Sequence, residues 1–123
     1  MKTVLLVDDS PTILMSVSGV LERHNLKAKT AKSAEEAMSI LDDGLKPDLI
    51  ISDLNMPGMN GIEFVKKARG LTGLRFTPIL MLTTESQQDK RDQARAAGAT
   101  GWLVKPVQGD QLMQVIRKVL PGT

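Results

Sequence analysis

The sequence predicts an α/β fold in which five parallel strands form one doubly wound sheet, covered by helices on both faces. Five short apolar runs alternate along the chain with five segments that have helical periodicity. Strands and helices that alternate in this way form right-handed βαβ units. We find no internal repeat, linker or low-complexity segment, so residues 1–123 are expected to form a single domain without an output domain.

Three local patterns predict the first strand, the first helix and the second strand. The first strand is expected at 3–7, where the apolar run ends in two acids. Ser10 followed by Pro11 is typical of an N-cap and a first helical position, so the first helix should extend from there to about Arg23. Alternation of apolar and basic residues at 26–31 predicts a strand with one side near solvent.

The middle of the chain contains the most informative stretch. A capping box at 33–36 begins the second helix, which Gly44 ends. Residues 48–53 are a short apolar run, typical of a strand buried on both faces. The run ends in Asp53 and is followed by a turn rich in Pro, Gly and Asn, after which helical spacing predicts a third helix at about 62–70.

The last third of the chain continues the alternation. We expect a fourth strand at 78–83, a polar helix at 87–97, a fifth strand at 100–104 closed by Lys105-Pro106, and an amphipathic helix at 107–120.

Composition excludes several classes of function. The net charge of +2 and the scattered basic residues do not indicate nucleic-acid binding, and two Phe, one Trp and no Tyr provide no platform for bases. No apolar run approaches the ~20 residues of a membrane span, and acids appear too early for a signal peptide. The absence of cysteine excludes disulfides and thiolate metal sites. We therefore expect a cytoplasmic protein without membrane insertion.

Polar residues follow four of the five predicted strands. In an open α/β sheet the ligand lies outside the carboxyl ends of the strands, which brings together five residues: Asp8, Asp9, Asp53, Thr83 and Lys105. Any one of them alone is explained by a helix cap, a turn or a solvated lysine. The ordered set at four strand ends favours a ligand site.

The chemistry of these residues indicates a divalent cation and a phosphoryl group. Two carboxylates about 4 Å apart repel by about 4 kcal/mol at an effective dielectric constant near 20, so they need a cation between them, or one must be protonated. Oxygen ligands without His or Cys indicate Mg²⁺ or Mn²⁺ rather than zinc. Lys105 adds a second positive charge and Thr83 a hydroxyl donor, which suit a phosphoryl group.

The chain resembles response-regulator receiver domains over essentially its whole length, most closely the single-domain chemotaxis regulators of the CheY type. The resemblance rests on Val-Asp-Asp-Ser at 7–10, Asp53 with Met-Pro-Gly-Met-Asn-Gly at 56–61, Thr83, and Lys105-Pro106. It implies a flavodoxin-like (βα)5 fold with strand order 2-1-3-4-5, an order that CheY itself exemplifies.

The resemblance also implies roles for the acidic residues. Asp53 is expected to be the phosphoacceptor, which takes a phosphoryl group from the phosphohistidine of a sensor kinase. Asp9, Asp53 and the backbone carbonyl of Asn55 are expected to ligate Mg²⁺, for which Mn²⁺ can substitute, while Asp8 acts largely through water. Asn55 and Glu85 are expected to tune the lifetime of the phosphoform and to make it short.

Further implied roles concern phosphate contacts and the switch. The Thr83 hydroxyl and the Lys105 ammonium would hold phosphoryl oxygens, and the Lys105–Pro106 peptide bond is expected to be cis. Thr83 and Trp102 would form the switch, in which Thr83 moves toward the phosphoryl group and the aromatic ring turns inward. Val107 replaces a Phe that is frequent in the family, a change expected to affect packing.

The expected function is that of a single-domain response regulator in chemotaxis or motility, not an enzyme beyond its own phosphotransfer and dephosphorylation. Expected partners are a CheA-like sensor histidine kinase or a histidine phosphotransfer protein, and an effector such as a flagellar switch protein. The chain is expected to be a monomer. The effector is expected to contact the face formed by the fourth helix, fifth strand and fifth helix.

Three alternatives stay open at this point. A phosphorelay intermediate or phosphate sink would share the whole site and differ only in its partner surface. A flavodoxin-like FMN electron carrier would need a phosphate-binding loop where Asp8-Asp9 would repel the FMN phosphate. An aspartate-nucleophile phosphatase would need a second Asp where Asn55 stands.

Overall fold

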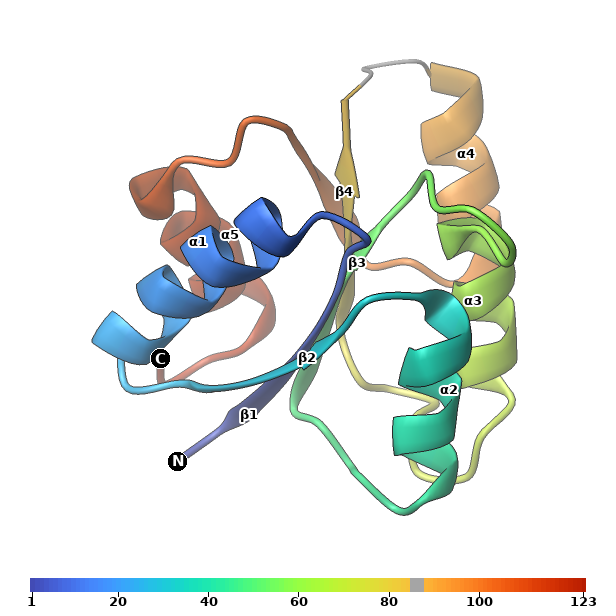
Figure 1. The fold of residues 1–123 in the computed structure, drawn as a ribbon, viewed down its shortest axis with the longest axis horizontal. Coiled ribbons are helices and arrows are strands. Elements are labelled where there is room, and N and C mark those ends of the chain that lie inside the picture. Colours follow the sequence, from blue (N-terminus) through green and yellow to red (C-terminus); the bar gives the residue numbers. More distant parts are fainter. Residues whose placement is uncertain (85–87) are drawn as a thin grey trace.

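Five parallel strands form one central sheet in the structure, a computed structural model that describes residues 1–84 and 88–123 (Figure 1). The strand order is β2-β1-β3-β4-β5, which confirms the predicted order. The strands are β1 Thr3–Val7, β2 Lys27–Ala31, β3 Leu49–Asp53, β4 Ile79–Thr83 and β5 Gly101–Val104.

Five helices cover the two faces of this sheet. In Figure 1, α1 and α5 lie together on one side of the sheet, and α2, α3 and α4 lie on the other. The helices are α1 Pro11–Arg23, α2 Ala34–Asp42, α3 Gly61–Arg69, α4 Gln88–Ala97 and α5 Gly109–Val119. None of the helices in the described residues is both long and apolar enough to span a membrane.

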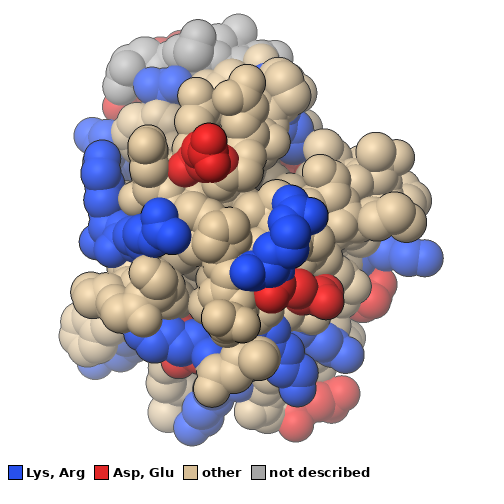
Figure 2. Space-filling view, turned by 90° about the vertical axis from the view of Figure 1, so that its left-hand side faces the viewer, with Lys and Arg blue, Asp and Glu red and all other residues tan. Residues whose placement is uncertain are grey.

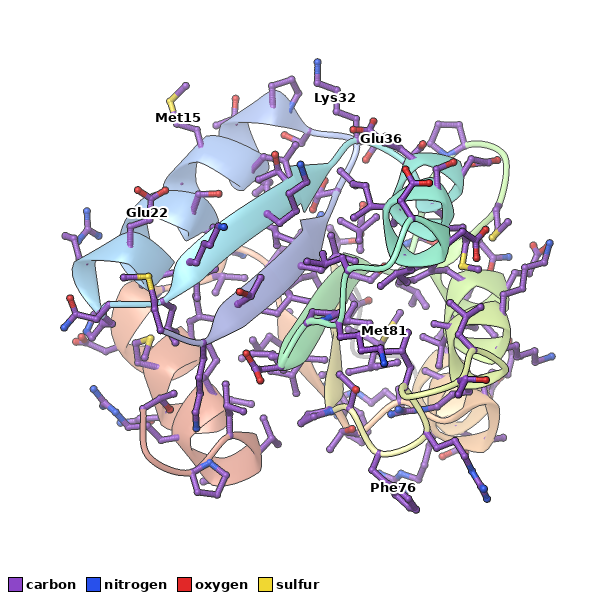
Figure 3. All side chains as sticks on the ribbon, turned by 90° about the horizontal axis from the view of Figure 1, so that it is seen from below. Met15, Glu22, Lys32, Glu36, Phe76 and Met81 are labelled. Carbon is purple, nitrogen blue, oxygen red and sulfur yellow. The ribbon has the colours of Figure 1, made fainter. Side chains whose placement is uncertain are left out.

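Successive residues of the central strands enter two separate apolar layers. In β1, Leu5 and Val7 pack on the side of α2 and α3, whereas Val4 and Leu6 pack on the side of α1 and α5. Because side chains alternate across a strand, a strand covered on both faces must be apolar throughout. Met81 of β4 points into the layer on the α3 side, whereas Phe76 points outward from the structure (Figure 3). These two layers hold the strand ends in fixed register.

The first two helices begin at the caps predicted from the sequence. The Ser10 hydroxyl accepts a hydrogen bond from the backbone amide of Ile13, and the Ser33 hydroxyl accepts one from Glu36. The capping box is incomplete, because the Glu36 carboxylate accepts from the amide of Lys32 rather than from that of Ser33.

Several predicted boundaries differ from the structure by one or two residues, among them the starts of two helices. The third helix begins at Gly61, one residue earlier than expected, because the side chain of Asn60 caps it. The fifth helix begins at Gly109 rather than at 107, and Gln108 precedes it without a side-chain cap. Val107 lies before this helix, partly buried against the apolar layer beneath α1 and α5.

Charged side chains are scattered over one face of the molecule. On the face that Figure 2 shows, basic side chains lie in separate patches among uncharged ones, with acidic side chains between them. This distribution agrees with the small net charge of +2. It offers no continuous basic stripe of the kind that binds a nucleic-acid backbone on this face.

Gly61 sets the distance between the end of β3 and the start of α3. A Cβ atom at this position would overlap with the backbone carbonyl oxygen of Asp53, and would lie 2.8 Å from Met81 Cε and 2.9 Å from Leu54 Cα. The amide of Gly61 also donates a hydrogen bond to the carbonyl oxygen of Leu54 at 2.9 Å. Close approach of two backbone segments therefore requires glycine here.

Replacement of this glycine should destabilise the fold. We expect Gly61→Ala to lower the free energy of unfolding by about 1–3 kcal/mol, the usual cost of overpacking, as measured by urea denaturation. Gly19→Ala is the matched control, because the nearest atom to its added Cβ is Arg23 Nη1 at 3.8 Å. In the interior of α1 this substitution should raise stability by about 0.5–1 kcal/mol. Equal stability of Gly61→Ala and the wild type would contradict the packing described here.

Candidate functional site

The carboxyl ends of four strands meet at one edge of the sheet. The parallel register pairs Val7 with Ser52, Asp53 with Leu82, and Thr83 with Val104. The residues that end or follow these strands therefore lie next to one another in space. The structure brings together all five residues that the sequence placed at this edge: Asp8, Asp9, Asp53, Thr83 and Lys105.

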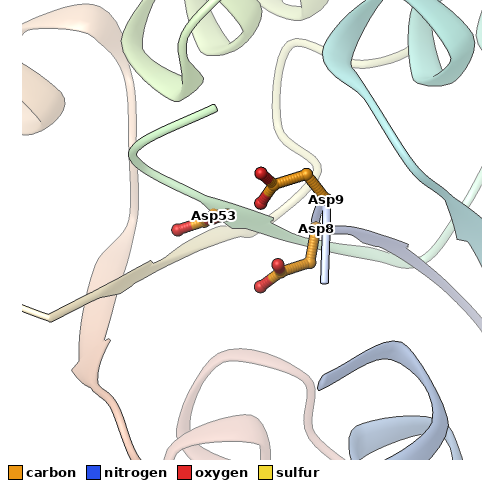
Figure 4. Close-up of side chains that lie close together, drawn as sticks. All are labelled: Asp8, Asp9 and Asp53. Atoms are coloured by element: carbon orange, nitrogen blue, oxygen red, sulfur yellow. The ribbon is translucent and has the colours of Figure 1, made fainter. Parts of the chain in front are cut away.

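Three carboxylates form the centre of the site (Figure 4). Asp8 and Asp9 follow β1, Asp53 ends β3, and each offers one oxygen atom that lies within 4.8 Å of those of the other two. Asp8 is fully buried and Asp53 is 5% exposed, whereas Asp9 is open to solvent. The cluster thus combines two desolvated carboxylates with one that solvent reaches.

The Lys105 ammonium lies between the two buried carboxylates. Its Nζ is 2.9 Å from Asp8 Oδ2 and 3.2 Å from Asp53 Oδ1. The Lys105 backbone amide donates to the carbonyl oxygen of Thr83 at 2.7 Å, which ties the loop after β5 to the end of β4. The Lys105–Pro106 peptide bond is cis, as predicted. One ammonium therefore balances part of the charge of three acids.

Burial and charge together set the protonation of this cluster. Burial raises the pKa of Asp53, and the negative charge of Asp8 raises it further, while the Lys105 ammonium opposes both effects. Burial alone would lower the pKa of Lys105, but hydrogen bonds and attraction to Asp8 and Asp53 outweigh it, so its pKa is raised. Lys105 therefore stays charged, and the carboxylates are left with an excess of negative charge.

Hydrogen bonds from the backbone orient the two buried acids. Asp8 Oδ1 accepts from the amide of Ser10 at 2.9 Å, and Asp53 Oδ1 accepts from the amide of Asn55 at 3.4 Å. Asp8 Oδ2 is buried, and its partner is the Lys105 ammonium 2.9 Å away. The three neighbouring carboxylates, of which Asp9 is exposed, suit a further cation with oxygen ligands.

The residues expected to form the switch lie beside this cluster. Thr83 is 3% exposed at the end of β4, and Trp102 of β5 is half-buried. Both line a small apolar recess under α4. Asn55 is exposed two residues beyond Asp53. Glu85, expected to tune the lifetime of the phosphoform, lies outside the described residues.

The sequence did not predict a contact that holds the loop after β3. The Glu35 carboxylate, in the first turn of α2, accepts a hydrogen bond from the backbone amide of Met59 at 3.1 Å. This contact lowers the pKa of Glu35. Gly58, with φ +76°, lies against the same carboxylate, so a side chain there would collide with it. Twenty-four residues separate the partners, so local patterns carry no signal for it.

A second unpredicted contact surrounds Trp102. The guanidinium carbons of Arg91 and Arg95, both in α4, lie 4.8 Å and 4.9 Å from the centroid of the indole ring. The spacing of four residues places the two arginines on one face of the helix. That spacing was visible in the sequence, but nothing local linked it to a residue in β5.

Comparison with known proteins identifies the class. The family model described as the response regulator receiver domain matches residues 4–117. The CheY1 chemotaxis protein of Helicobacter pylori is 34% identical, with 95% of each chain covered. The PilH protein of Pseudomonas aeruginosa is 30% identical over 99% of this chain and 100% of its own.

Solved structures agree with this class. The structure of chemotaxis protein CheY4 of Vibrio cholerae is similar with a TM-score of 0.94 and 45% identity, covering 98% of this chain and 99% of that one. The receiver domain of the sensor histidine kinase PA1611 of Pseudomonas aeruginosa, solved with a magnesium ion in its active-site cleft, has a TM-score of 0.88, 22% identity and 97% coverage of each chain. At 22% identity, the similarity to the PA1611 receiver domain shows a shared fold and no more.

The chain therefore belongs to the response-regulator receiver domain family. It is a CheY-like receiver of two-component signalling, with the flavodoxin-like fold predicted from the sequence. The family also occurs within longer proteins, since this chain spans 53% of the PhoB transcriptional regulator of Pseudomonas aeruginosa, to which it is 31% identical. An FMN electron carrier and an aspartate-nucleophile phosphatase are not supported by this assignment.

Removal of the Asp53 charge should stabilise the fold at neutral pH. Without divalent cations, we expect Asp53→Asn to raise the free energy of unfolding on the order of 1 kcal/mol, because the amide carries no charge to bury. The raised pKa of Asp53 means that the folded protein binds this proton more tightly than the unfolded chain does. Lowering the pH toward that pKa protonates Asp53 and removes the cost of burying its charge in the wild type. The difference in the free energy of unfolding between Asp53→Asn and the wild type should then shrink.

Thermal or urea unfolding in EDTA over a range of pH measures this difference. Asp42→Asn, at an exposed position at the end of α2, is the matched control and should change stability little. An Asp53→Asn variant less stable than the wild type at pH 7 would contradict the electrostatic description of the site.

Proposed function

We propose that this chain is a phosphorylation-dependent signalling protein in which Asp53 accepts a phosphoryl group from the phosphohistidine of a sensor kinase. The observation that carries the proposal is the contact of the Lys105 ammonium with the buried carboxylates of Asp8 and Asp53, beside the third carboxylate of Asp9. Such an arrangement supplies a carboxylate nucleophile next to groups that neutralise incoming phosphate charge.

The proposed reaction needs little covalent chemistry from the protein. An Asp53 carboxylate oxygen bonds to phosphorus while the bond from phosphorus to the histidine nitrogen breaks, and that electron pair stays on the imidazole. Lys105 would contact phosphoryl oxygens, and the Thr83 hydroxyl would donate to one of them. Backbone hydrogen bonds to Asp8 and Asp53 support the proposed role of Asp53 as phosphoacceptor, because they hold both carboxylates in place before the phosphohistidine binds.

The donor set fits Mg²⁺, and Mn²⁺ as a substitute. Oxygen atoms of Asp8, Asp9 and Asp53 lie within 4.8 Å of one another, and no His or Cys competes among them. Asp9, Asp53 and the backbone carbonyl of Asn55 would hold the ion directly, and Asp8 would act through water. The ion would supply positive charge for the carboxylates and the phosphoryl oxygens. The magnesium ion in the PA1611 receiver domain supports this choice.

Chemotaxis or motility is the proposed pathway. Similarity to CheY proteins and to PilH over nearly the whole of each chain supports it. Residues 1–123 would act as one cytoplasmic, monomeric receiver that is not an enzyme beyond its own phosphotransfer and dephosphorylation. A CheA-like kinase or a histidine phosphotransfer protein would supply phosphate, and an effector such as a flagellar switch protein would read the phosphoform.

Phosphorylation by a small donor tests the proposed chemistry directly. Incubation with acetyl phosphate and Mg²⁺ should add a single phosphoryl group, detected by intact mass. The adduct should be absent in Asp53→Asn and in the presence of EDTA. In Lys105→Met it should form at least about tenfold more slowly, because the variant loses the charge that neutralises the incoming phosphate.

The Asp42→Asn protein serves as the control and should be phosphorylated as readily as the wild type, because its carboxylate is remote from the sheet edge. An adduct that persists in Asp53→Asn would place the phosphoacceptor elsewhere. A folded wild-type protein that forms no adduct with either acetyl phosphate or a phosphorylated kinase would overturn the proposed function.

A further inference from the structure

The loop 54–60 connects the end of β3 with the start of α3 and contains Asn55. The amide of Leu54 donates to a carbonyl oxygen of β4, and its carbonyl oxygen accepts from the amide of Gly61, both at 2.9 Å. Asn55 is tied more loosely, because its amide lies 3.4 Å from Asp53 Oδ1. The path of the loop beyond Leu54 therefore decides where the backbone of Asn55 lies.

A carboxylate from α2 holds the middle of this loop. Glu35 Oε2 accepts a hydrogen bond from the amide of Met59 at 3.1 Å. The same oxygen atom lies 2.6 Å from the place that a Cβ atom of Gly58 would occupy, and the φ of Gly58 is +76°. The close approach and the left-handed backbone both require glycine there. Two consecutive residues of the loop are thus fitted to the Glu35 carboxylate.

The segment between Met59 and Asn55 is stiff. It consists of Met56, Pro57 and Gly58. The ring of Pro57 fixes its own φ and restricts the backbone of Met56. The Met56 side chain is buried in the apolar layer on the side of α2 and α3, which anchors this segment at one point. The Glu35 contact adds a second anchor, and two anchors fix the orientation of a stiff segment that could turn about one.

We propose that Glu35 is a positioning residue for the cation site, because its carboxylate holds the loop so that the backbone carbonyl of Asn55 faces the bound ion. The inference rests on the proposed function, in which that carbonyl ligates Mg²⁺. A backbone carbonyl has no rotamer of its own, so the path of the chain alone sets its direction. Groups that orient a metal ligand commonly change metal affinity by about 10- to 100-fold when they are removed.

Glu35 is suited to hold the loop and lies outside the set of ligands. It belongs to the first turn of α2, and the three carboxylates grouped at the sheet edge do not include it. The hydrogen bond from Met59 is the largest cause of the lowered pKa of Glu35, and the amide of Glu35 itself and the charge of Lys67 lower it further. The side chain is therefore ionised at neutral pH, and a hydrogen bond from an amide to a carboxylate is stronger than one to a neutral acceptor.

Binding of Mn²⁺, followed by the EPR signal of the free ion, tests the inference without any phosphoryl transfer. We expect Glu35→Ala to raise the dissociation constant for Mn²⁺ about tenfold, because the loop loses its second anchor. In the metal-free protein, the Met59 amide of this variant should exchange with solvent faster than in the wild type, as measured by NMR. Glu36→Ala is the matched control, since the Glu36 carboxylate accepts from the amide of Lys32 instead. It removes the same charge from the same helical turn and should bind Mn²⁺ as the wild type does.

Two conservative variants separate the position of the acceptor from its charge. Glu35→Gln keeps a side-chain oxygen at the same reach, so its dissociation constant for Mn²⁺ should stay within about threefold of the wild-type value, since a neutral acceptor gives a weaker hydrogen bond. Glu35→Asp keeps the charge, but its side chain is one methylene shorter and does not reach Met59. It should therefore weaken binding about as much as Glu35→Ala does. The Asp variant also decides the question if Glu35→Ala does not fold.

The outcomes separate this inference from the proposed function. A folded wild-type protein that binds no Mn²⁺ overturns the cation site, and the positioning role with it. Binding by the wild type and equally tight binding by Glu35→Ala overturns the positioning role alone. Equal weakening in Glu35→Ala and Glu36→Ala, or a Glu35→Asp protein that binds more tightly than Glu35→Gln, shows that only the charge of the helix matters and also overturns it.

Discussion

The contact between the Lys105 ammonium and the buried carboxylates of Asp8 and Asp53 is the constraint on which the rest of the site depends. Desolvated carboxylates repel each other strongly, and one lysine does not balance three acids. Burial, and next the negative charge of Asp8, raise the pKa of Asp53. A fold that keeps these charges together at the sheet edge must stabilise itself elsewhere. The two apolar layers on either side of the sheet provide that stability. Because they do, the fold tolerates a site with fewer positive than negative charges.

That shortage of positive charge connects the structure to its proposed function. A cation or a charged phosphoryl group entering the site changes the balance among groups that the strand ends hold in place. Thr83 joins the acidic cluster to the recess beside Trp102, and Trp102 in turn contacts Arg91 and Arg95 of α4. The backbone amide of Lys105 donates a hydrogen bond to the carbonyl oxygen of Thr83, so the acidic cluster and the recess meet at the end of β4.

Local patterns in the sequence were enough to predict most of the strands and helices and the polar residues at the strand ends. The strands β1, β3 and β4 are mostly apolar because both their faces are covered, so their positions and the polar residues at their ends were predictable. The start of α5 was placed two residues early, because Gln108 makes no side-chain cap to mark it. The contacts of Glu35 with Met59, and of Arg91 and Arg95 with Trp102, join distant elements. Such contacts depend on how helices pack on the sheet, which periodicity does not encode.

The most direct test of this account is the unfolding midpoint as a function of Mg²⁺ concentration, for the wild type and for Asp9→Asn/Asp53→Asn. If the carboxylates form a cation site, the midpoint of the wild type rises with each increase in Mg²⁺, because the ion binds the folded state alone. The double variant should then show no such rise. A wild-type midpoint that does not respond to Mg²⁺, or an equal rise in the double variant, would contradict the claim that the acidic cluster is held ready for a cation.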